Sequence, residues 1–240
     1  MRIVSLVPSF TKTLFDFELD SSQIVGRTKF CIHPKEEVTK VQIIGGTKDL
    51  KLEKIRALKP DLILASKEEN EKDQVESLQS EFNVWVTDIQ TLNDNKEFLT
   101  QLGERLQKQD LAHCFNKKLD EMFNSLPKGP GKSLTYFIWK DPYLSVGGDT
   151  FIHAVIEQLG FKNSHEKSKR YPMVTLEALA KEKIILLSSE PYPFKEKHKE
   201  ELLALYPHLK IHLVDGEAFS WYGTHLLEFE SHYRELVSIL

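Results

Sequence analysis

The chain has 240 residues, a formal charge of −4 and 28% charged residues, which is typical of a globular protein with one large domain or two small ones. Its basic residues are spread along the sequence, which argues against nucleic-acid binding. No window approaches the roughly 18 apolar residues of a membrane-spanning helix. Two cysteines, Cys31 and Cys114, lie far apart in the sequence and form no CxxC pair, which argues against a disulfide framework.

Short apolar runs alternate with helix-type patterns in the first part of the chain. Strands are predicted at residues 2–7, 24–26, 41–44, 61–65 and 84–87, and helices at 9–19, 52–58 and 70–82. Ser9 is the expected N-cap of the first helix. This alternation implies right-handed crossovers and a mostly parallel sheet, so we expect an N-terminal α/β lobe over residues 1–93.

Residues 93–126 close the longest run without proline and carry an apolar stripe that predicts helix. The stripe consists of Phe98, Leu102, Leu106, Leu111, Phe115, Leu119, Met122 and Leu126. Asp94 followed by Glu97 predicts a capping box at its start. Gln107–Asp110 is a candidate break, with the longer rod behind it. We expect a helical strut over residues 94–130 that joins two lobes.

Strand and helix patterns return after this strut. Strands are predicted at 133–139, 184–187 and 211–214, with 143–146 pairing back on the first of them, and helices at 150–159, 176–181, 195–205 and 226–240. We therefore expect a C-terminal α/β lobe over residues 131–240. The segment 62–68 is echoed by 184–190, which places matching strand ends across a cleft, where parallel sheets bind ligands.

A glycine-containing turn, Gly45-Gly46-Thr47-Lys48, follows one predicted strand. It lacks the GxxxxGK[ST] spacing of a phosphate-binding loop. Two interpretations stay open: a turn that lets a ligand approach the backbone, and a plain turn. No GxSxG, HExxH or strand-following GxGxxG occurs, so nucleophilic catalysis has no support. We expect a protein that is not an enzyme and carries no cofactor.

Four residues suggest metal binding as an alternative: Cys31, His33, Glu68 and Glu190 have side chains that bind zinc and other transition metals. Their spacing is not that of a standard zinc site. His33 is equally compatible with a hydrogen bond to a ligand or with a structural role. Glu68 and Glu190 follow predicted strands, and three interpretations stay open: they face a ligand, they are solvated, or they cap the next helix.

Five aromatic residues fall in loops or at strand ends rather than on helical stripes: Phe30, Trp139, Tyr192, Trp221 and Tyr222. A flat apolar ligand needs such rings to stack against. The run Phe219–Gly223 follows directly after a predicted strand, and we interpret it as a binding wall. Trp221 is then expected to be partly exposed; the alternative is a core tryptophan under the final helix.

A family resemblance rests on four segments: Arg2–Thr11, Gly45–Thr47, Leu52–Leu62 and Ser145–Ile152. They resemble the helical-backbone (class III) substrate-binding proteins, which capture cobalamin and iron chelates for ABC importers, and most of all the cobalamin-receptor branch. The resemblance implies two α/β lobes bridged by a long helix, with the ligand held in the cleft between them and little hinge closure.

Matching residues to the family by position implies a set of ligand-binding residues. In the first lobe these are Pro8, Ser9, Gly46, Thr47, Lys67 and Glu68. In the second lobe they are Trp139, Gly148, Asp149, Glu190 and Trp221. Trp221 matches an aromatic residue that stacks beside the corrin, whereas Lys67 stands where the cobalamin receptor carries another tryptophan.

The resulting hypothesis is a monomeric binder of a large metal chelate, either a corrinoid such as cobalamin or cobinamide or an iron chelate, that serves an ABC permease. A transition-metal receptor and a cytosolic chelatase-like enzyme acting on a tetrapyrrole are the alternatives. The apolar run Ile3–Val7 is too short for a signal peptide. As written, the chain is expected in the cytoplasm, or in the periplasm or at the cell surface if a leader was removed.

Overall fold

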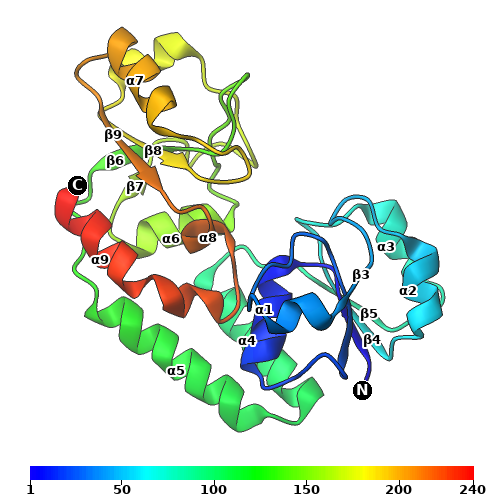
Figure 1. The fold of residues 1–240 in the computed structure, drawn as a ribbon. Coiled ribbons are helices and arrows are strands. Elements are labelled where there is room, and N and C mark those ends of the chain that lie inside the picture. The colour runs from blue at the N-terminus through cyan, green and yellow to red at the C-terminus, as the bar shows by residue number, and fades with distance from the viewer. The chain divides into compact units, whose positions relative to one another are not determined.

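The computed structural model describes residues 1–240, which form two compact units, each with its own parallel sheet (Figure 1). The first unit consists of residues 1–89, 93–117 and 222–225, and the second of residues 90–92, 118–221 and 226–240. The chain therefore enters the first unit again near its C-terminus. None of the helices combines the length and the apolar character that crossing a lipid bilayer requires.

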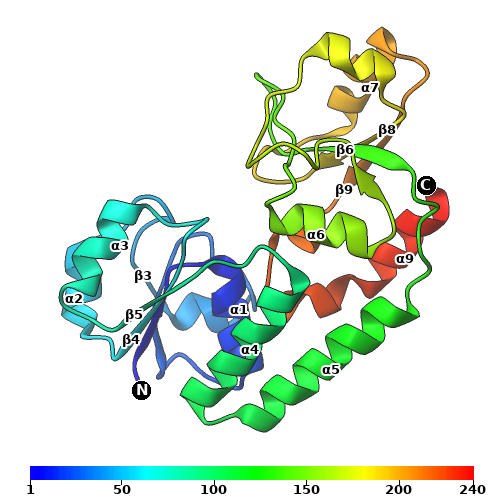
Figure 2. The ribbon, with the colours of Figure 1, turned by 180° about the vertical axis from the view of Figure 1, so that it is seen from behind.

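Five parallel strands form the sheet of the first unit, in the order β3-β2-β1-β4-β5. They are β1 (Ile3–Ser5), β2 (Ile24–Arg27), β3 (Gln42–Ile43), β4 (Leu62–Ser66) and β5 (Val84–Thr87). Figures 1 and 2 show α2 (Leu52–Leu58) and α3 (Lys72–Gln79) on one face, and α1 (Pro8–Asp16) and α4 (Leu92–Leu106) on the other. A short 3-10 helix, η1 (Glu37–Lys40), precedes β3.

The core of this unit follows from the period-2 alternation of its strands. Val4 pairs with Ile63, and both pack with Ile55 of α2 and Leu78 of α3. On the opposite face, Phe10 of α1 stacks on Phe98 of α4, with ring centroids 4.5 Å apart. Both faces of the sheet are therefore covered, as a parallel sheet requires.

The predicted break in the long helical run is confirmed. Helix α4 ends at Leu106 and α5 (Gln109–Ser125) follows after a turn in which Gln107 has a positive φ of 57°. Close packing beside this turn requires glycine at position 103, because a Cβ there would lie 2.6 Å from the Cβ of Ala112. The predicted capping box is wrong, since α4 begins at Leu92 and Asp94 lies inside its first turn.

Four parallel strands form the sheet of the second unit, in the order β7-β6-β8-β9. They are β6 (Ser133–Phe137), β7 (Lys162–Asn163), β8 (Ile184–Ser188) and β9 (Lys210–Val214). The helices are α6 (Phe151–Gln158), η2 (Leu176–Lys181), α7 (Glu196–Leu205), α8 (Glu217–Ser220), η3 (His225–Phe229) and α9 (Glu230–Ile239). Figures 1 and 2 show α7 on one face of the sheet and α6 with α8 on the other.

The expected α/β class with mostly parallel sheets is confirmed, and every named strand pair is parallel. One local prediction is wrong: Ser9 lies inside α1, whose N-cap is Val7, because Pro8 already occupies the first helical position. The predicted pairing of residues 143–146 is confirmed in part: Leu144 makes isolated antiparallel bridges to Trp139 and to Met173, but no strand forms there.

Candidate ligand-binding site

Asn70 ties together the carboxyl ends of three strands in the first unit. Its Nδ2 donates to the carbonyl oxygens of Leu6 (3.2 Å) and Thr47 (3.0 Å), and its Oδ1 accepts from the backbone N–H of Ser66 (2.9 Å). These three partners follow or end β1, β3 and β4. The amide therefore fixes the segments that carry Pro8, Thr47 and the predicted residues after β4.

The loop after β2 is held by a buried guanidinium. Arg27 donates from Nε to the carbonyl of Val38 (2.7 Å) and from NH1 to the carbonyls of Thr28 (3.2 Å) and Cys31 (2.9 Å). Buried carbonyl groups need such donors once water is excluded. The clamp gives the loop that carries His33 a defined conformation.

Phe30 and Gly46, both predicted site residues, are neighbours. The Phe30 ring is half exposed (50%), and a Cβ on Gly46 would lie 3.3 Å from its Cε2. The ammonium of Lys29 lies 5.0 Å from the Phe30 ring centroid, a cation–π arrangement. Pro8 and Ser9, by contrast, are buried in the first turn of α1.

The predicted residues after β4 differ in exposure: Lys67 is exposed and Glu68 is half-buried. Lys67 forms an ion pair with Asp88 (Nζ–Oδ2 2.6 Å), and both side chains are exposed. Glu68 donates its backbone N–H to Ser66 Oγ (3.2 Å). The same Ser66 hydroxyl lies 3.2 Å from the hydroxyl of Tyr222, which is a buried residue of the first unit.

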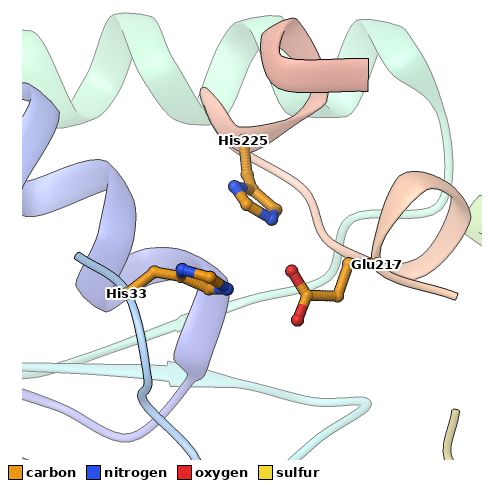
Figure 3. A group of neighbouring side chains, drawn as sticks. All are labelled: His33, Glu217 and His225. Carbon is orange, nitrogen blue, oxygen red and sulfur yellow. The ribbon is translucent and has the colours of Figure 1, made fainter. Parts of the chain in front are cut away.

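His33 has a neighbour that the sequence did not predict, His225 of the same unit. The two ring centroids are 5.2 Å apart with an interplanar angle of 34°, and ligand nitrogens of the two rings lie within 4.8 Å of each other. Figure 3 shows the two imidazoles; it also labels Glu217, which belongs to the second unit. These two histidines are the residues of the first unit best suited to hold a metal.

The surroundings of Cys31 do not favour the metal-ligand role considered for it. Its sulfur accepts a hydrogen bond from Thr11 Oγ1 (3.0 Å) and lies 3.2 Å from Thr28 Oγ1. Burial raises the pKa of the Cys31 thiol, which opposes formation of the thiolate that metals bind. The thiol is therefore a core group of the first unit.

In the second unit, Trp139 displays its ring on the surface after β6. The side chain is 41% exposed, and Tyr192 meets it edge-on, with ring centroids 5.8 Å apart. Tyr192 is in turn fixed by an edge contact with Phe194 (4.8 Å) and by its hydroxyl, 3.3 Å from Nε2 of His198. The two predicted aromatic residues thus form one braced apolar surface, hereafter the Trp139–Tyr192 surface.

Gly148 and Asp149 both contact the backbone of residues 166–170. The N–H of Gly148 donates to the Ser168 carbonyl (3.0 Å), and a Cβ on Gly148 would lie 2.1 Å from the carbonyl oxygen of Glu166. Asp149 Oδ1 accepts from the N–H of Arg170 (2.6 Å). Close backbone approach therefore explains this glycine without a ligand, and the ligand-binding role stays a prediction.

Glu190 binds Trp221 within the second unit. Its Oε1 accepts hydrogen bonds from Nε1 of Trp221 (2.9 Å) and from Oγ of Ser220 (2.8 Å). Burial raises the pKa of the Glu190 carboxyl, and these two hydrogen bonds partly oppose the rise. Trp221 is only 8% exposed, so the expectation of a partly exposed ring is wrong.

The aromatic run after β9 does not form a continuous wall. Phe219 is fully buried in the second unit, 5.0 Å from the ring of Tyr136. Tyr222 belongs to the first unit and packs 5.5 Å from Phe10. The run therefore supplies core contacts to both units, and its backbone divides between them after Trp221.

Comparisons with known proteins all point to one family of binding proteins. The periplasmic binding protein family model matches residues 3–204. An uncharacterized ABC transporter substrate-binding lipoprotein of Bacillus subtilis is 28% identical over 199 residues, which cover 75% of this chain and 60% of that protein. A vitamin B12-binding protein of Vibrio vulnificus is 25% identical over 182 residues, covering 73% of this chain and 66% of that one. The chain thus spans less than two thirds of the length of these relatives.

Solved structures support the same fold. The periplasmic heme-binding protein BhuT, in a complex with two hemes, superposes with a TM-score of 0.82, covering 99% of this chain and 98% of that one at 18% identity. At this identity the likeness concerns the fold alone.

Proposed function

Because this chain belongs to the periplasmic binding protein family, we propose that it binds a planar metal chelate, a corrinoid such as cobalamin or cobinamide, and delivers it to an ABC permease. This family consists of binding proteins. Membership in it therefore favours ligand binding over the chelatase-like alternative. The observation that carries the proposal is the Trp139–Tyr192 surface.

This surface has the properties that a flat apolar ligand requires. An exposed indole offers a large face at little conformational cost, and the edge contact with Tyr192 fixes its orientation before any ligand arrives. Phe30 gives the first unit a second half-exposed ring beside a glycine-containing turn. Exposed aromatic side chains of this kind commonly mark ligand-binding surfaces.

The relatives support the ligand class and the partner. The Vibrio relative is named for vitamin B12, and the Bacillus relative is named as part of an ABC transporter. We extend both properties to this chain as proposals, together with action outside the cytoplasm, which importing a ligand requires. The remaining predicted residues of the site, among them Lys67, Glu68 and Gly148, are proposed to contact the chelate from the loops that carry them.

The test is a titration of cyanocobalamin, cobinamide, hemin and a ferric tris-catecholate into purified protein, followed by quenching of tryptophan fluorescence. We expect saturable binding of a corrinoid. Trp139→Ala should weaken it by about 1 kcal/mol, roughly fivefold, as expected for one aromatic contact. Leu205→Ala is the control, since Leu205 is an exposed apolar residue at the end of α7 in the same unit.

Three results would contradict the proposal or its ligand. If none of the four chelates binds, the ligand class is wrong. If a corrinoid binds equally well to wild type and Trp139→Ala, the Trp139–Tyr192 surface is not the binding surface. Binding of hemin or the iron chelate alone would keep the family role and replace the corrinoid.

A further inference from the structure

We propose that His33 and His225 together bind a divalent first-row transition-metal ion, such as Zn²⁺, Co²⁺ or Ni²⁺. The site lies within the first unit and does not depend on the proposed chelate binding. Imidazole nitrogen is a preferred ligand of all three ions.

The separation of the two rings suits chelation of one ion. Their ligand nitrogens lie within 4.8 Å of each other. In tetrahedral coordination, two nitrogens bound to one zinc ion at about 2.0–2.1 Å are roughly 3.4 Å apart. Side-chain adjustments that shorten the present separation by up to about 1.5 Å therefore bring both nitrogens into the first coordination sphere.

Each histidine lies on a segment whose backbone is fixed by buried polar side chains. His33 lies within the loop bound by Arg27, which donates to the carbonyls of Cys31 and Val38 on either side of it. A metal site on such a loop requires little ordering of the backbone when the ion binds.

His225 follows a segment that is fixed in a similar way. Asn95 accepts from the backbone N–H of Gly223 and donates to its carbonyl (3.3 Å). The N–H of Thr224 donates to Thr13 Oγ1 (3.2 Å). Two independent polar networks thus place two imidazoles from distant parts of the sequence beside each other.

Exposure differs between the two ligands in a way that fits an open metal site. His225 is buried, with 1% of its surface exposed, whereas His33 is half-buried. An ion can therefore approach from the side of His33, and water can fill the remaining coordination positions. Simple ring packing is the competing explanation, and it predicts no dependence on metal.

The first experiment measures Zn²⁺ binding to untagged, metal-free protein by calorimetry. We expect one ion per chain, with affinity at least about tenfold lower in His33→Asn and in His225→Asn, since loss of even an outer-shell partner weakens metal sites by that factor. His113→Asn is the matched control, because His113 is exposed on α5, and it should bind as wild type does.

The second experiment needs no variant, which matters because buried His225 could affect folding. Zinc-edge X-ray absorption of the wild-type complex should show two imidazole ligands among the nine histidines of the chain. The proposal fails if fewer than two imidazoles bind the ion. It also fails if wild type shows no saturable one-to-one binding, or if both folded variants bind as tightly as wild type.

Discussion

The two units fix loops after their strands with different hydrogen-bonding groups, although Asn163 of the second unit also donates, to the carbonyl of Val146 (2.8 Å). In the first unit donors dominate: Arg27 binds three carbonyl groups of one loop, and the amide of Asn70 binds two more. In the second unit carboxylates accept: Asp149 binds a backbone N–H, and Glu190 binds an indole and a hydroxyl.

The difference has a physical consequence. Guanidinium and amide groups keep the same protonation state across the ordinary pH range, whereas a carboxylate can be neutralised. The first unit should therefore lose stability mainly when a donor is removed, and the second should also respond to pH. Three experiments test this comparison.

The largest effect is expected for Arg27→Met, which keeps an apolar side chain but removes three hydrogen bonds to buried carbonyl groups. Leaving these acceptors unsatisfied should lower the free energy of unfolding by at least about 3 kcal/mol. Urea unfolding measures this. Arg56→Met is the control: Arg56 pairs with Glu53 and Glu81 at the surface, and its loss should change stability far less. Similar losses of stability in both variants would mean that the hydrogen bonds of Arg27 to buried carbonyl groups contribute no more than surface ion pairs do.

A smaller difference should separate Asn70→Ala from Asp149→Ala. Asn70 makes three backbone hydrogen bonds, so its loss should reduce stability by about 2–3 kcal/mol. Asp149 accepts one such bond, from the N–H of Arg170, and its loss should reduce stability by about 1 kcal/mol. Hydrogen exchange should show the change near β4 in the first variant only. If the order of the two effects is reversed, the second unit holds its loops more firmly than we infer.

The smallest effect concerns the pH dependence of stability through Glu190. Its pKa is raised in the folded state, so between the ordinary value of 4.5 and the raised value the native protein binds more protons than the unfolded chain. Stability from this group is therefore fully present below pH 4.5 and is lost as pH rises through the folded pKa. Glu190→Gln, which can still accept from Trp221, should lack this loss.

Urea unfolding of wild type and Glu190→Gln between pH 4 and pH 8, values chosen to bracket that window, checks this prediction. The variant should gain stability relative to wild type as pH increases. A constant difference at every pH would show that Glu190 does not titrate within the range. The stability difference between Asn70→Ala and wild type should not change with pH, because an amide does not titrate and both proteins keep Glu190.

Much of the fold could be predicted because its signals are local. The apolar spacing of Leu52–Leu58 and the β-branched and aromatic run Val84–Thr87 gave elements with the bounds that the structure shows. The break near Gln107 was also visible, since the apolar stripe loses its spacing there. Exposed aromatic character at Phe30 and Trp139 could be inferred because both lie outside the helical stripes.

The sequence did not indicate the structural roles of Asn70, Asn95 and His225. Asn70 follows two acidic residues after a strand, and His225 follows an aromatic run, but neither position indicates its partners. The hydrogen bonds of Asn70 reach residues 23 and 64 positions away, and that of Asn95 reaches 128 positions away. Such partners are chosen by packing, which sequence spacing does not report.

Trp221 and Tyr222 show most clearly what only the tertiary structure decided. They are adjacent in the sequence, yet one binds Glu190 in the second unit and the other packs on Phe10 in the first. Their position directly after a predicted strand indicated that both would be important aromatic residues. Their partners depended on which core each ring could enter, because burying an indole or a phenol requires a hydrogen-bond partner at the right place.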